Sequence, residues 1–135
     1  MSNVRVSVLV ELLKGAHDHT LQIAESVPET HRLKQLQDGK ATPLWLLGHL
    51  ANTINTIVLI YTLEQPSVLS REQAKLFSPD FVGGETPTTN ADEYPSWDEV
   101  VELYKTAFAK ALEGIDALDD ESLPNPLPGK LADEM

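Results

Sequence analysis

Residues 42–52 read TPLWLLGHLAN, and this stretch predicts the start of the most buried helix of the protein. Thr42 can cap a helix through its hydroxyl, and Pro43 at the first helical position loses no hydrogen bond, because that N–H would be unpaired in any helix. Apolar residues then continue on nearly every side to about Leu63, which is the pattern of a buried helix. The β-branched residues 54–60 can alternatively form a strand, but no flanking strand is available as a partner.

His49 is the candidate for chemistry, because it lies in the middle of this apolar helix. An unpaired imidazole there would pay a desolvation penalty, so His49 needs a hydrogen-bond partner. Asn52 and Thr53 follow at helical spacing and give the same side of the helix a polar strip. From spacing alone, a hydrogen-bonded core histidine is the more frequent case and a metal ligand the less frequent one.

Two further long helices flank this one. Apolar residues recur every three or four positions over 4–27, and Pro28 ends that helix. Ser96 and Glu99 form the pattern of a capping box, which begins a helix with an apolar seam over 97–118. The seam consists of Trp97, Val101, Tyr104, Phe108, Ala111, Ile115 and Leu118.

Between these helices lies a long segment, residues 65–95, which is rich in proline and glycine and in which residues 70–77 can form a short helix. A connection of this length can border a pocket, although a crossover that wraps the bundle is the simpler interpretation. We therefore expect an all-α, up-down helical bundle with three main helices, forming a single domain over residues 1–135.

Composition limits the classes of function. The chain has no cysteine, which excludes disulfides, thiolate metal sites and a cysteine nucleophile. A formal net charge of -11 repels nucleic acid and anionic membrane surfaces. The most apolar run, residues 54–63, is about half of the roughly 20 residues that span a bilayer, and residues 1–6 lack the pattern of a secretory signal. We expect a cytoplasmic protein that binds neither nucleic acid nor membrane.

The remaining histidines and acidic residues offer no second site. His17 and His19 point roughly 200° apart on a regular helix, so they cannot both bind one metal ion, and His31 falls in a polar connector. The acidic residues 116–121 are the solvated end of a helix. There is no glycine-rich phosphate loop and no G-x-S-x-G elbow.

Residues 42–52 are similar to the second-helix motif of DinB-like proteins, and the order of the other helices resembles that superfamily as well. The resemblance implies a four-helix bundle that holds a divalent metal (Zn, Ni or Fe) with three histidines. His49 would be the first ligand, and an H-x-x-x-H pair on the final helix would supply the other two. The implied activity is that of a metal-dependent transferase or hydrolase, with a substrate that the resemblance does not specify.

The sequence departs from that pattern after residue 118, where no H-x-x-x-H pair occurs before Met135. We therefore expect the fourth helix to be missing, either because the chain is shortened or because another chain supplies it. Three helices would expose an apolar groove, which predicts a homo-oligomer, most simply a dimer. The alternative function is a non-catalytic, metal-free module that binds a small molecule or a partner helix in this groove.

Overall fold

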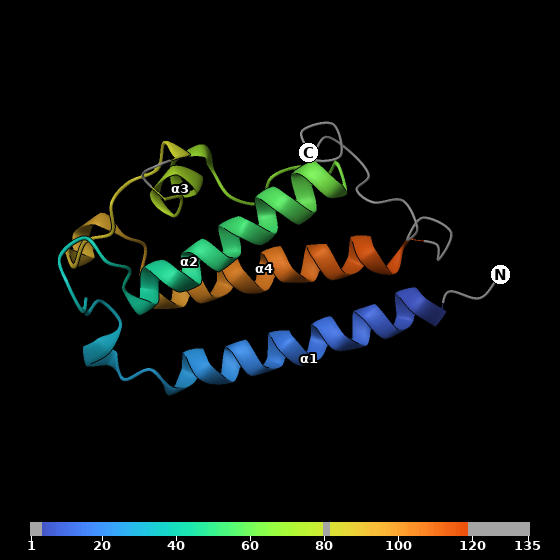
Figure 1. The fold of residues 1–135 in the computed structure, drawn as a ribbon, viewed down its shortest axis with the longest axis horizontal. Coiled ribbons are helices and arrows are strands. Elements are labelled where there is room, and N and C mark those ends of the chain that lie inside the picture. The colour runs from blue at the N-terminus through green and yellow to red at the C-terminus, as the bar shows by residue number, and fades with distance from the viewer. Residues whose placement is uncertain (1–3, 80–81, 119–135) are drawn as a thin grey trace.

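The protein is a bundle of helices in the computed structural model, which describes residues 4–79 and 82–118. Every regular element in these ranges is helical, which confirms the all-α prediction. Three long helices lie side by side, and the short α3 lies beside α2 on the outside of the bundle (Figure 1). The elements are α1 (Val4–Ser26), η1 (Glu29–His31), α2 (Pro43–Thr53), η2 (Ile54–Thr62), α3 (Arg71–Leu76), η4 (Ala91–Glu93) and α4 (Trp97–Asp116).

Side-chain caps set the starts of α2, α3 and α4, and those of α2 and α4 were predicted. The Thr42 hydroxyl accepts the backbone N–H of Trp45 at 3.0 Å, and Ser96 accepts that of Glu99 at 3.2 Å. Ser70 forms a reciprocal capping box with Gln73. Each cap satisfies a backbone donor that the first turn of a helix leaves without a partner.

The segment that follows α2 is a π-helix rather than a strand, so the alternative of a strand over residues 54–60 is wrong. Its backbone bonds reach back five residues, as from the Leu63 N–H to the Val58 carbonyl at 2.8 Å. α2 and η2 together form one continuous helix. Long π-helical stretches are rare and widen the helix locally.

The core lies around α4, which packs against α2, η2 and α1, and α1 packs more closely on α4 than on α2. The predicted seam of α4 is confirmed only in part. Tyr104 and Ala111 are buried, but Val100 and Ala107 are buried more completely than Trp97, Val101 and Phe108.

α2 is the most buried of the long helices in the described ranges, as predicted, because six of its 11 residues are buried against four of 20 in α4 and three of 23 in α1. It nevertheless has an exposed side. Leu46 and Leu50 are 49% and 43% exposed, because α1 does not cover this side of α2. Within the described ranges, Pro43–Thr62 is the one helix that is long and apolar enough to cross a membrane by length and composition alone. The prediction considered only residues 54–63, about half of a membrane span, whereas the continuous helix has 20 residues. Contact with α4 and the buried Asn52 and Asn55 are features of a core helix.

Candidate functional site

Three side chains on one face of α2 hold the end of α3. Trp45, His49 and Asn52 are spaced by four and three residues, which places them in a row along the helix. The Trp45 Nε1–H donates to the Leu76 carbonyl at 3.0 Å. His49 Nδ1 lies 2.9 Å from the Phe77 carbonyl oxygen, and Asn52 Nδ2 donates to Ser78 Oγ at 2.9 Å. We call these three hydrogen bonds the clasp.

The clasp solves a problem of backbone hydrogen bonding. The last carbonyl groups of a helix have no donors within the helix, so partners must come from elsewhere when that end is buried. Here the Phe77 side chain is fully buried against α2. Gly48 makes this possible, because a Cβ at this position would overlap the Phe77 ring. Each clasp bond contributes about 0.5–1.5 kcal/mol of net stability.

The clasp determines the tautomer of neutral His49. A carbonyl oxygen can only accept, so Nδ1 carries the hydrogen and Nε2 carries the lone pair. The ring stacks on Trp45, with centroids 4.8 Å apart and planes 12° apart, which further restricts its orientation. Nε2 makes no hydrogen bond within the part of the chain that the structure describes. The Nε2 lone pair of half-buried His49 is therefore held in a fixed direction, as a metal ligand requires.

A second polar contact fastens the beginning of the same crossover. Asn55 is buried at the start of η2, where its Nδ2 donates to Ser67 Oγ at 2.9 Å and its Oδ1 accepts the Val68 N–H at 2.7 Å. α2 and η2 therefore hold both ends of residues 67–78. Sequence reasoning did not identify Asn55 as part of the site. Its signal was an amide in an otherwise apolar helix.

The other histidines are separate from this site. His19 and His31 are exposed, as expected for His31. His17 lies between α1 and α4, where its ring stacks on Phe108 at 4.3 Å and on Tyr104 at 5.2 Å. Its Nδ1 is buried without a hydrogen-bond partner among the described residues. Burial lowers the pKa of His17, and Lys105 on α4 lowers it further, while Asp18 opposes the shift.

A metal site cannot be built from the described residues alone. They contain no group of three His, Asp or Glu side chains that could hold a metal ion. His49 has the tautomer of a ligand but belongs to no such group among residues 4–79 and 82–118. The prediction that no fourth helix follows residue 118 falls on residues 119–135, as do most of the acidic residues 116–121, and these residues lie outside the described ranges.

Comparison with known proteins agrees with the motif. The profile of the DinB superfamily matches residues 12–135. Comparison with curated proteins and with solved structures gave no match.

His17 should make stability depend on pH. Because its folded pKa lies below 6.5, the unfolded chain binds more protons than the folded one at a pH between the folded pKa and 6.5. The His17 contribution is thus complete above 6.5 and is lost as the pH falls towards the folded pKa. Urea unfolding at several values between about pH 5 and pH 8 should show this fall.

The variant His17→Phe keeps an aromatic ring against α4 and removes the titration, so its unfolding free energy should fall less over the same range. The control is His19→Phe on the exposed side of α1, which should keep the dependence of the wild type. An unchanged dependence in His17→Phe would show that another group is responsible.

Proposed function

This chain belongs to the DinB superfamily, and from that premise we propose that His49 is one ligand of a divalent-metal site for Zn, Ni or Fe. The observation that carries the proposal is the hydrogen bond from His49 Nδ1 to the Phe77 carbonyl. Metal-binding histidines commonly donate their second ring N–H to a backbone carbonyl, which fixes the tautomer and the direction of the metal-binding nitrogen. In His49 that nitrogen is Nε2.

One imidazole does not retain a divalent metal at useful affinity, so the proposal requires further ligands. They lie outside the described residues, either within 119–135, whose sequence has carboxylates but no histidine, or on another chain. A transferase or hydrolase activity depends on this completed site. The catalytic residues and the substrate are not part of the proposal.

A second candidate function is a metal-free module that binds a ligand, and a cleft between α1 and α2 favours it. The cleft has a volume of about 290 Å³. Ligand sites are typically concave and mostly apolar. The residues that line the cleft are Thr20, Ile23, Ala24, Val27, Pro43, Leu46, Leu47, Leu50 and Trp97.

We also propose that the protein is a homodimer in the cytoplasm, without nucleic-acid or membrane partners. Val4, Val8 and Leu12 recur every four residues on one side of α1 and are 61%, 54% and 68% exposed. A continuous apolar surface of this kind favours association. The net charge of -11 supports the exclusion of phosphate-rich partners.

The metal proposal predicts that protein purified after growth with added Zn, Ni and Fe retains a stoichiometric metal after dialysis. Elemental analysis should show that His49→Ala loses this metal, because the substitution removes the Nε2 donor. The control His31→Ala removes an exposed imidazole and should retain it.

A second control separates the ligand from the clasp. Trp45→Phe removes the hydrogen bond to Leu76 but leaves the imidazole, so it should lower stability and keep the metal. Metal-free wild-type protein, or full metal content in His49→Ala, would overturn the proposal.

The dimer proposal predicts twice the monomer mass in sedimentation equilibrium. Leu12→Glu should shift the protein to the monomer, because a buried, unpaired carboxylate in the interface is costly. The control Lys14→Glu changes an exposed residue whose partner, Glu11, is also exposed. A monomeric wild-type protein would contradict the proposal.

A further inference from the structure

The cleft between α1 and α2 has an apolar lining, and a cation contacts one of its lining residues. Ile23 of α1 and Val27 just after it line one side of the cleft, Leu46 and Leu50 of α2 line the other, and Trp97 at the start of α4 also contributes to the wall. None of the described residues that line it is charged. The cleft occupies the half of the bundle that adjoins the connector between α1 and α2.

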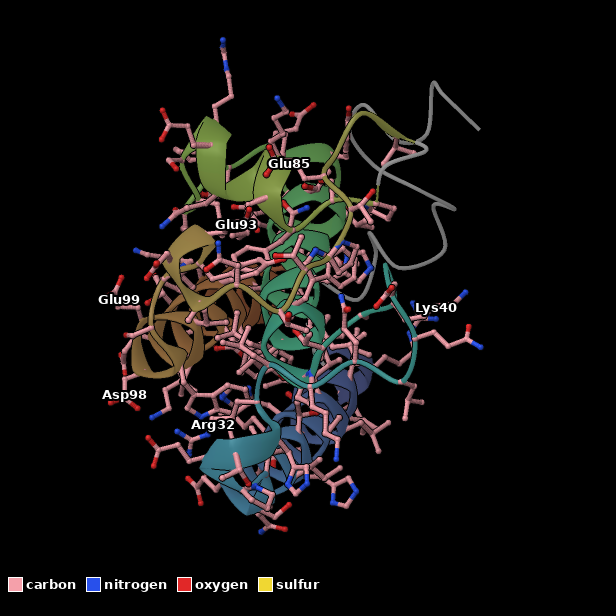
Figure 2. All side chains as sticks on the ribbon, turned by 90° about the vertical axis from the view of Figure 1, so that its left-hand side faces the viewer. Arg32, Lys40, Glu85, Glu93, Asp98 and Glu99 are labelled. Carbon is pink, nitrogen blue, oxygen red and sulfur yellow. The ribbon has the colours of Figure 1, made fainter. Side chains whose placement is uncertain are left out.

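Arg32 of that connector lies beside the cleft, as two contacts show. Its carbonyl accepts the N–H of Leu44 at 2.9 Å, next to Pro43 of the lining. Its guanidinium carbon lies 4.8 Å from the centre of the Trp97 ring, which is also part of the lining. Figure 2 shows Arg32 on the connector side of the bundle, just after η1.

The charge of Arg32 has no carboxylate partner within the described ranges, although the chain has 21 Asp and Glu residues. Its Nε is buried and makes no hydrogen bond there. A buried donor without an acceptor is costly, and a charged one more so. The guanidinium therefore favours an external acceptor, and its planar fork matches a carboxylate.

We propose that the cleft binds an amphipathic anion, a straight-chain carboxylate whose tail lies between α1 and α2 and whose head group pairs with Arg32. This proposal rests on the binding-module candidate and is independent of the metal site. At about 30 Å³ for each water-sized group, the cleft holds roughly ten non-hydrogen atoms. Octanoate has this size.

The local contact decides the sign of the ligand charge. The net charge of the chain attracts cations at long range, but exposed charges beyond about 8–10 Å are largely screened at physiological salt. Within that distance the Arg32 guanidinium contacts the ring of Trp97, a residue of the lining, while the described lining residues include no carboxylate. The charge of the bound head group is therefore negative.

Isothermal titration with octanoate tests the proposal. We expect one octanoate per chain, and weaker binding of octylammonium, which has a similar tail and the opposite charge. Arg32→Gln should weaken octanoate binding about tenfold or more, as expected for a lost charged hydrogen bond. The control Lys34→Gln, an exposed cation of the same connector, should leave the affinity unchanged.

Leu50→Asp is a second variant, at a position exposed enough to tolerate it, and it should abolish binding by placing a carboxylate in the lining. Circular dichroism checks that each variant is folded. Absence of octanoate binding, equal affinity in Arg32→Gln, or tighter binding of octylammonium would each overturn the proposal. The metal content of the same samples is measured separately, so failure of the metal site is distinguishable from failure of the cleft.

Discussion

Packing of the end of α3 against α2 removes backbone carbonyl groups from water. The structure therefore depends on side-chain hydrogen-bond donors that take the place of water at these carbonyls. Trp45 and His49 supply hydrogen bonds to the carbonyls of Leu76 and Phe77. Without them, packing of the Phe77 ring on Gly48 would leave two acceptors unsatisfied at a cost of about 1–3 kcal/mol each. This one contact explains the spacing of Trp45, Gly48 and His49. Trp45 bonds to the Leu76 carbonyl, while Gly48 and His49 contact the ring and the carbonyl of Phe77.

The same contact connects the fold with the proposed chemistry. A histidine that supports a buried carbonyl through Nδ1 keeps its Nε2 lone pair, so the structural role of His49 does not compete with metal binding but prepares for it. The two interpretations from the sequence, a hydrogen-bonded core residue and a ligand, describe opposite sides of one ring. The apolar cleft lies on another side of α2 and involves Leu46 and Leu50, so the helix carries two distinct surfaces.

Local sequence signals predicted the helix starts well, because Thr42, Ser70 and Ser96 cap through contacts within three residues. Non-local features were not predictable in this way. The partner of His49 lies 28 residues away on a backbone carbonyl, which no side-chain pattern reveals. The π-helix of residues 54–62 depends on backbone register, and its apolar composition is compatible with an α-helix or a strand. The burial of Val100 and Ala107 depends on how closely neighbouring helices approach α4.

The protonation of His49 tests the central claim most directly. Nitrogen-15 NMR of the imidazole, at a pH where the ring is neutral, distinguishes a protonated ring nitrogen from one that carries a lone pair. The account predicts the Nδ1–H tautomer, with Nε2 unprotonated, in the wild type and in the His17→Phe variant that simplifies the spectrum. An Nε2–H tautomer would contradict it for two reasons. Nδ1 would have no hydrogen to donate to the Phe77 carbonyl, and Nε2 would have no lone pair to bind a metal.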